Sequence, residues 1–175
     1  WLFNIVFISG MAMVLTCITA SLAGYALAKK RFIGRAVLFT IIICAMALPK
    51  QVIVIPLNQE MTQIFHLNDT LWAVILPTVG WPFGVFLMKQ FMEGIHDAIL
   101  ESARIDGAGE MRICWRIVMP SVKPAWITLI IFVFQGVWSN TGGNMIYTEA
   151  GKVLPTVLTQ ISATGMVRAG VGAAA

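Results

Sequence analysis

The sequence predicts an all-α membrane protein, a polytopic bundle of transmembrane helices in a single domain over residues 1–175. Hydrophobic residues make up 58% of the chain, charged residues only 11%, and the mean hydropathy is +0.83. Such a composition leaves too little polar surface for an ordinary soluble domain. The charges also gather between apolar stretches, and about 20 apolar residues suffice to cross a hydrocarbon core.

The first apolar stretch predicts a span over residues 2–28, because no charged side chain interrupts it. Lys29, Lys30, Arg31 and Arg35 follow at once. By the positive-inside rule, such a cluster marks the cytoplasmic end of a span. The first span therefore runs from outside to inside.

The second apolar stretch predicts a span back outward over residues 36–57, interrupted at Pro49 and ended near Pro56. Lys50 and Gln51 lie at the interruption. A charge at membrane depth is costly and usually faces a cavity, so both residues are candidates for lining a path through the membrane. Alternatively, the helix ends near Pro49 and Lys50 extends its ammonium group to the outer interface.

Three further apolar stretches complete the predicted bundle. A third span covers residues 70–90 and is broken by Pro77 and Pro82. A fourth span covers residues 124–140, and a last helix starts within residues 153–175.

The loop between the third and fourth spans, residues 91–123, is densely charged. With it, most of the twelve Lys and Arg residues fall on one side of the predicted topology, namely Lys29, Lys30, Arg31, Arg35, Lys89, Arg104, Arg112, Arg116 and Lys123. This distribution places the loop in the cytoplasm without reference to any motif.

Within this loop, the segment from Glu101 to Pro120 predicts two short helices at a bend. At helical period, one face of the first helix collects small or apolar residues, namely Ile95, Ala98, Ile99, Ser102 and Ala103. Asp106-Gly107 predicts the turn, because Gly reaches positive φ without steric cost. A second short apolar pattern follows, and Pro120 ends it.

The spacing inside this segment resembles the EAA signature of the permease subunits of bacterial binding-protein-dependent ABC importers. That signature reads Glu-Ala-Ala, three residues, Gly, nine residues, Ile, one residue and Leu-Pro. This chain has Glu101-Ser102-Ala103, Gly107, Ile117 and Met119-Pro120 at these places. It departs at Ser102, where Ala is usual, and at Met119, where Leu is usual, but both replacements keep the approximate size. A generic charged loop, the alternative interpretation, does not account for the spacing.

Within that family the chain looks most like the carbohydrate-uptake group, the relatives of the maltose transporter's smaller membrane subunit. The run from Glu101 to Gly109, with Asp106 and Ala108 inside it, is close to that group's form. The resemblance covers nearly the whole chain and implies the importer permease fold of six helices. This chain would hold the second to fifth helices, with the first missing and the sixth only begun.

The resemblance implies a multi-pass subunit of the bacterial inner membrane that is not itself an enzyme. A second permease subunit would complete the pathway, an extracytoplasmic solute-binding protein would deliver the solute, and a cytoplasmic ABC ATPase dimer would use ATP and Mg²⁺. The EAA segment would dock on the ATPase, with Ser102 and Ala103 small enough to seat closely. Glu101 would accept charge-assisted bonds, and Gly107 would permit the bend. The chain itself would bind no cofactor, and its outer surface would face membrane lipid.

The sequence leaves the solute open. A sugar or oligosaccharide fits the group resemblance, and an amino acid, a peptide or a phosphate ester is the alternative. A passive channel and a membrane-embedded enzyme are rivals of another class, but an enzyme needs ionisable groups that converge at membrane depth, and only Lys50 and Arg168 are of that kind. The sequence shows no phosphate-binding loop and no metal motif, and its net charge of +4 follows the topology rather than indicating nucleic acid.

Overall fold

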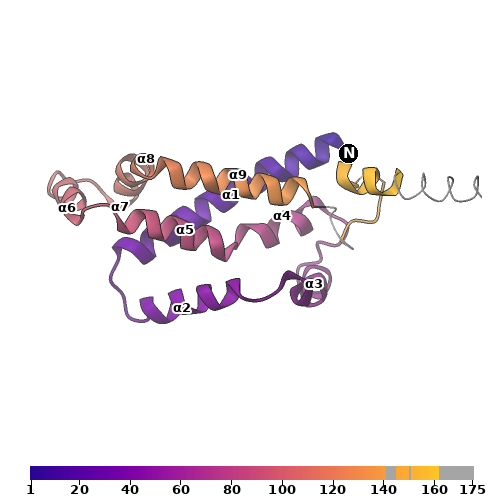
Figure 1. Cartoon of the computed structure of the whole chain (residues 1–175), viewed down its shortest axis with the longest axis horizontal. Helices are drawn as coiled ribbons and strands as arrows, with labels where there is room; N and C mark the ends of the chain where they lie inside the picture. The colour runs from indigo at the N-terminus through magenta and orange to yellow at the C-terminus, as the bar shows by residue number, and fades with distance from the viewer. Residues whose placement is uncertain (141–144, 150, 162–175) are drawn as a thin grey trace, which may run out of the picture.

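The computed structural model describes residues 1–140, 145–149 and 151–161, with the backbone alone at residues 50 and 51. All regular secondary structure within these ranges is helical. The longest helix, α1 (Leu2–Lys29), runs through the middle of the bundle (Figure 1). It forms without interruption because it contains neither proline nor an internal charge, and it ends where the basic cluster begins.

Helix α1 packs against α4 (Leu71–Val79), α5 (Pro82–Glu93) and α9 (Lys123–Trp138). Its buried face carries a small residue at every fourth position, namely Ala12, Thr16, Ala20, Gly24 and Ala28. Gly24 lies so close to α5 that a Cβ atom added there would be 2.7 Å from the Cβ of Met88. Small residues allow transmembrane helices to approach closely, and they set the tight packing of this bundle.

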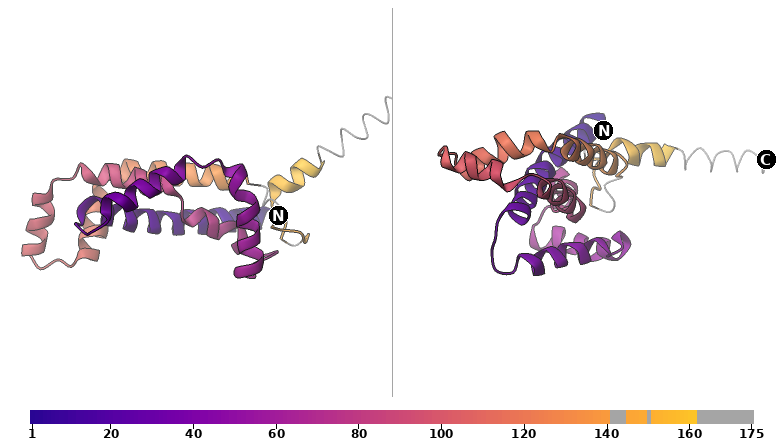
Figure 2. Two further views of the ribbon diagram at one scale, coloured as in Figure 1. Left: turned by 90° about the horizontal axis from the view of Figure 1, so that it is seen from below. Right: turned by 60° about the vertical axis from the view of Figure 1, so that its left-hand side comes forward.

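The predicted second span is two helices, α2 (Arg35–Met46) and α3 (Lys50–Gln59), followed by the π-helical turn η1 (Glu60–Ile64). The helix breaks before Pro49, which is extended with ψ of 132°, because a residue preceding proline is disfavoured in the α region. Helix α3 then runs across the long axis of the molecule (Figures 1 and 2). Pro56 lies inside α3 rather than at its end, although an interior proline lacks the backbone N–H and its ring crowds the carbonyl four residues before it.

The third predicted span is the bent pair α4 and α5. The break falls at Gly80-Trp81, just before Pro82, whereas Pro77 lies within α4. By length and composition, two helical stretches among the described residues can cross a membrane, α1 and Leu71–Glu93. A third qualifies only if Glu110–Ser121 and Lys123–Trp138, bent by 84° at Val122, are taken together.

Helices α2 and α9 are shorter than the spans predicted over residues 36–57 and 124–140. They contain 12 and 16 residues, which at 1.5 Å per residue extend about 18 and 24 Å. A hydrocarbon core is about 30 Å thick. Helix α9 nearly coincides with its predicted span, whereas apolar composition overestimated the length of the second span, because the backbone breaks before Pro49.

One end of the bundle carries the N-terminus, α3 and residues 145–149 and 151–161 (Figures 1 and 2). Asp69 joins two segments there, since its carboxylate accepts the backbone N–H groups of Tyr147 and Thr148 at 2.8 and 3.0 Å. Of the predicted last helix, residues 154–161 are helical, and residues 162–175 lie outside the described residues.

Candidate functional site

The opposite end of the bundle holds the predicted loop, which folds as short helices beyond the ends of α1 and α5 (Figure 1). They are α6 (Asp97–Ile105), α7 (Glu110–Ile113), the π-helical turn η2 (Cys114–Val118) and α8 (Met119–Ser121). Lys29, Lys30, Arg35, Lys89 and Arg104 all take part in ion pairs here. Five of the nine basic residues predicted to share one side of the membrane therefore form ion pairs at one end of the molecule.

The turn predicted at Asp106-Gly107 is confirmed. Gly107 has φ of +80° and follows Asp106, the C-terminal cap residue of α6. The N–H of Gly107 donates to the carbonyl of Arg104 at 3.0 Å, and the N–H of Ala108 donates to that of Ala103 at 2.9 Å. This pair of bonds is a Schellman motif, which ends a helix with a residue in the left-handed region. Only glycine adopts that region readily, so Gly107 fixes the direction in which the chain leaves α6.

The predicted apolar face of α6 is largely exposed. Ala103 is buried beside Leu100, which is 1% exposed, whereas Ile99 and Ser102 face outward with Glu101. The structure thus separates Ala103, which is buried, from Ser102 and Ile99, which are exposed on the same predicted stripe, because periodicity identifies an apolar stripe but not what covers it. The exposed stripe on α6 also includes Ala98 and Ile105, of which Ile105 is 86% exposed.

The second helix of the loop does not end at Pro120. It passes through that residue to Ser121, and the chain turns at Val122, which has φ of −108° and ψ of 31°. Proline is tolerated here because it stands at the start of α8, after the π-helical turn. Ile117 is partly buried against the core, whereas Pro120 lines an apolar groove of about 650 Å³ between α1 and the η2–α9 segment.

A carboxylate at the start of α7 ties the loop to α1. Glu110 Oε1 lies 2.5 Å from Lys30 Nζ and 3.0 Å from Arg104 Nε. Its other oxygen accepts a hydrogen bond from the Tyr25 hydroxyl at 2.6 Å. Hydrogen bonds to Lys30 first, and then to Tyr25, lower the pKa of Glu110 from its ordinary value of 4.5 to about 2. Glu110 is therefore ionised at any physiological pH.

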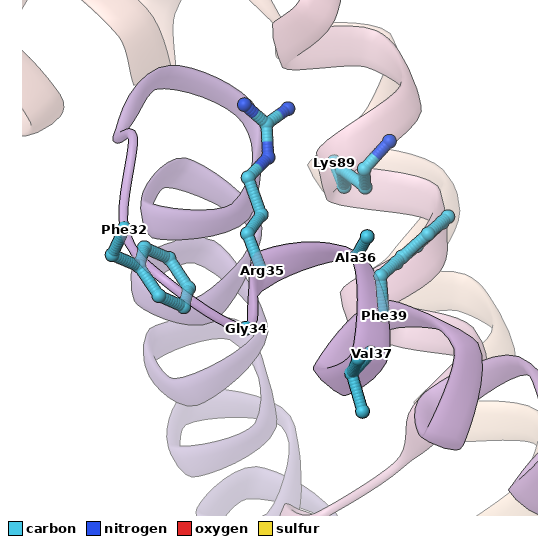
Figure 3. A pocket seen from close by; sticks show the side chains of 7 residues that line it. All are labelled: Phe32, Gly34, Arg35, Ala36, Val37, Phe39 and Lys89. Carbon is cyan, nitrogen blue, oxygen red and sulfur yellow. The ribbon is translucent and has the colours of Figure 1, made fainter.

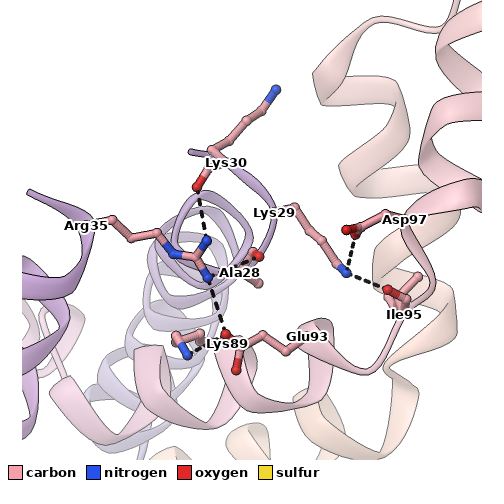
Figure 4. Close-up of polar contacts among 8 residues, drawn as sticks. All are labelled: Ala28, Lys29, Lys30, Arg35, Lys89, Glu93, Ile95 and Asp97. Atoms are coloured by element: carbon pink, nitrogen blue, oxygen red, sulfur yellow. Dashed lines mark hydrogen bonds and ion pairs between the residues drawn. The ribbon is translucent and has the colours of Figure 1, made fainter. Parts of the chain in front are cut away.

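Two further ion-pair groups lie at the ends of α1, α2 and α5 (Figure 4). Lys29 Nζ donates to the Ile95 carbonyl at 2.5 Å and to Asp97 Oδ1 at 2.8 Å, at the start of α6. The hydrogen bond and charge of Lys29 lower the pKa of Asp97. Glu93 of α5 receives both Lys89, at 2.7 Å, and Arg35, at 3.3 Å. These contacts join the ends of α1, α2 and α5 to the loop.

A cleft of about 470 Å³ opens beside the second group, between the start of α2 and α5 (Figure 3). The residues that line this cleft include Arg35, Lys89, Phe32 and Phe39. Lys89 also lies over the ring of Phe39, with Nζ 4.0 Å from the ring centroid, so its charge is held by both a ring and a carboxylate. The cations here serve the contact between α2 and α5.

The two path candidates, Lys50 and Gln51, have side chains outside the described residues, and their backbone begins α3. Among the residues that the structure describes, no group of three or more His, Cys, Asp or Glu side chains could hold a metal ion. Sequence reasoning missed Tyr25 and Glu110 as a pair. The one local signal is that Tyr25 lies one turn before the basic cluster. The sequence around Tyr25 does not point to Glu110, because 85 residues separate the two.

Comparison with known proteins gives one family for nearly the whole chain. Residues 6–174 match the model of the family described as "Binding-protein-dependent transport system inner membrane component". The arabinooligosaccharides transport system permease protein AraQ of Bacillus subtilis is 36% identical over 140 residues, which are 80% of this chain and 50% of that protein. The sn-glycerol-3-phosphate transport system permease protein UgpE of Yersinia enterocolitica is 32% identical, over 91% of this chain and 58% of that protein.

A solved structure has the same fold. One chain of a bacterial ABC transporter involved in the import of the acidic polysaccharide alginate superposes with a TM-score of 0.78 and 27% sequence identity, over 87% of this chain and 53% of that chain. The chain described here spans about half the length of the curated relatives that it matches.

Proposed function

Because the chain belongs to the family of binding-protein-dependent transport system inner membrane components, we propose that it is the membrane part of an ATP-driven importer and that α6 is its docking element for a cytoplasmic ATPase. The importer would also contain a second permease subunit and an extracytoplasmic solute-binding protein. ATP and Mg²⁺ would be bound by the ATPase dimer, which would hydrolyse the nucleotide.

The observation that carries this proposal is the exposed stripe on α6. Helix α6 stands beyond the bundle (Figure 1), and Ile99 and Ile105 are 47% and 86% exposed. Apolar side chains gathered on one exposed face of a charged segment favour contact with another protein. Ser102, between them, is small enough to let a partner surface approach the backbone.

Glu101 supplies the polar part of the surface. Its carboxylate is exposed, and it forms no hydrogen bond or ion pair with the other residues that the structure describes. It is therefore available to a basic residue of the ATPase through a charge-assisted hydrogen bond. ATP-driven closure of the ATPase dimer would favour one of two conformations of the membrane part through such differential contacts.

A sugar or oligosaccharide is the proposed solute. The relatives include permeases named for arabinooligosaccharides, for α-glucosides in Rhizobium meliloti and for diacetylchitobiose in Streptomyces coelicolor. A phosphate ester is the second candidate, because a permease named for sn-glycerol-3-phosphate matches over 91% of this chain. Lys50 and Gln51 are the proposed path residues.

Replacing Gly107 tests the docking surface. Gly107→Val places a β-branched residue at φ of +80°, which costs roughly 1–2 kcal/mol or more and redirects the exit from α6. The variant should reach the membrane but lose both co-purification of the ATPase and solute uptake. Gly107→Asn is the matched control, since asparagine tolerates the left-handed region and no atom lies within 4 Å of the added Cβ.

The measurement uses the assembled transporter in vesicles with an arabinooligosaccharide, an α-glucoside and sn-glycerol 3-phosphate as separate solutes. Uptake of either sugar without uptake of sn-glycerol 3-phosphate supports a sugar as the solute. Uptake of sn-glycerol 3-phosphate without uptake of either sugar would make the phosphate ester the solute instead. A valine variant that retains its ATPase and transports like the parent would contradict the docking role of α6.

A further inference from the structure

Glu110 binds three donors that come from the end of α1 and from α6. Tyr25 belongs to α1, Lys30 is its C-terminal cap residue, and Arg104 lies in the last turn of α6. The distances are 2.6 Å to the Tyr25 hydroxyl, 2.5 Å to Lys30 and 3.0 Å to Arg104. One carboxylate therefore joins the end of α6 to the end of α1.

The start of α6 is joined to the same end of α1. Lys29, whose side chain is 5% exposed, donates to the carbonyl of Ile95 and to Asp97. Figure 4 shows its ammonium group pointing from α1 into the bend that precedes α6. The two ends of α6 are thus held by consecutive residues at the end of α1, the start by Lys29 directly and the end by Lys30 through Glu110.

Apolar contact between α6 and the rest of the chain is small by comparison. Leu100 and Ala103 are the buried residues of α6. Two buried side chains on one edge of a helix leave it free to rotate about that edge, whereas polar contacts at both ends fix its direction. The polar contacts with α1 therefore set the orientation of α6.

Helix α1 is suited to carry a displacement into the bundle. Its small residues bring it against α5 so closely that a Cβ on Gly24 would also lie 3.0 Å from the backbone nitrogen of Lys89. Closely packed interiors are hard to compress and transmit strain. A shift of the end of α1 must therefore move α5 and α9 with it.

We propose that Glu110 is a positioning residue that couples α6 to α1, so that movement of α6 imposed by the ATPase reaches the membrane helices through Tyr25 and Lys30. This inference rests on the proposed docking role of α6 but concerns a different step. Docking depends on the exposed face of α6, whereas coupling depends on the contacts that hold α6 to α1.

Glu110→Gln tests the inference, because it keeps the shape of the side chain and removes its charge. In the assembled transporter the variant should still co-purify with the ATPase and hydrolyse ATP. The ratio of solute taken up to ATP hydrolysed should fall about 5-fold or more, the lower end of the range for coupling between sites. Glu101→Gln, on the exposed face of α6, should instead weaken ATPase association.

Tyr25→Phe provides a second variant that removes only the hydroxyl group. If Tyr25 acts through Glu110, the double variant should be no worse than Glu110→Gln alone, since effects of residues in one hydrogen-bonded group are not additive. Tyr147→Phe is the matched control, because that ring is exposed at the opposite end of the bundle and should leave the ratio unchanged.

Three results would overturn the inference: an unchanged ratio in Glu110→Gln, additive losses in the double variant, or loss of the ATPase from Glu110→Gln. Failure of Gly107→Val to affect ATPase association would instead overturn the docking proposal. If Glu110→Gln does not accumulate in the membrane, Tyr25→Phe alone tests the inference. An undiminished ratio of solute taken up to ATP hydrolysed in that variant would contradict a coupling role for the contact between Tyr25 and Glu110.

Discussion

The middle of α1 and its charged end contact the rest of the molecule in different ways. Where α1 packs inside the bundle, Gly24 and Ala20 meet α5 through atoms that cannot move independently of the backbone. At the charged end, Lys29 and Lys30 reach their partners through long flexible side chains. The packed contact therefore depends on the size of its residues, and the end depends on their charge.

This difference separates stability from orientation. Overpacking a close helix contact costs about 1–3 kcal/mol, whereas exposed ion pairs contribute about 0–1 kcal/mol. The carboxylate side chain of Glu110 is 42% exposed, so its contacts contribute little to the free energy of unfolding. They decide instead where α6 points, and charged contacts of this kind can be remade without unfolding the bundle.

The largest expected effect is on Gly24. Gly24→Ala places a Cβ 2.7 Å from the Cβ of Met88 and 3.0 Å from a backbone nitrogen, so α1 and α5 must move apart. We expect a loss of about 1–3 kcal/mol in the free energy of unfolding. Thermal unfolding in detergent, followed by tryptophan fluorescence, measures it.

Gly10→Ala is the matched control for Gly24→Ala on the same helix. No atom lies within 4 Å of a Cβ at Gly10, and alanine is the better helix former, so this variant should be as stable as the parent or slightly more so. Equal stability of the two variants would contradict the close contact between α1 and α5, and with it the contrast between the two regions.

A smaller effect is expected when the charged end is titrated. The pKa of Glu110 is lowered from 4.5 to about 2, so the stabilising contribution of its ionised form is complete above pH 4.5 and is lost as the pH falls toward 2. The protection factors of the α6 backbone amides, which correct for the pH dependence of intrinsic exchange, should fall over that interval, while those in the middle of α1 stay high. In Glu110→Gln, the part of this fall due to Glu110 should disappear, and a fall identical to that of the parent would assign it to other carboxylates.

The features that the sequence predicted correctly depend on residues that are close together in the chain. Helix α1 and the turn at Gly107 were predicted because an apolar run and a glycine are local signals. The contact between Tyr25 and Glu110 could not be predicted, because it exists only once α1 and α7 are brought together. The buried edge of α6 at Leu100 was missed for the same reason, since no local pattern states which neighbour covers which face.

The smallest effect is expected at Ser102, one of the two departures from the EAA signature. Its hydroxyl donates to the carbonyl of Ile99 at 3.0 Å within α6, and its side chain is exposed. A serine that bonds to its own helix gives up little when the hydroxyl is removed, and alanine is favoured in helices by roughly 0.5 kcal/mol. Ser102→Ala should therefore leave both stability and ATPase association within the error of the parent.

Ser102→Trp provides the contrast at the same position. The indole keeps α6 folded, because the side chain points outward, but it prevents a partner from approaching the helix backbone. Co-purification of the ATPase should be lost with unchanged thermal unfolding. If the tryptophan variant keeps its ATPase, the exposed face of α6 does not dock, and side-chain size would matter only where α1 packs against α5. If the variant loses the ATPase, side-chain size matters in both regions, inside the bundle for stability and on α6 for recognition.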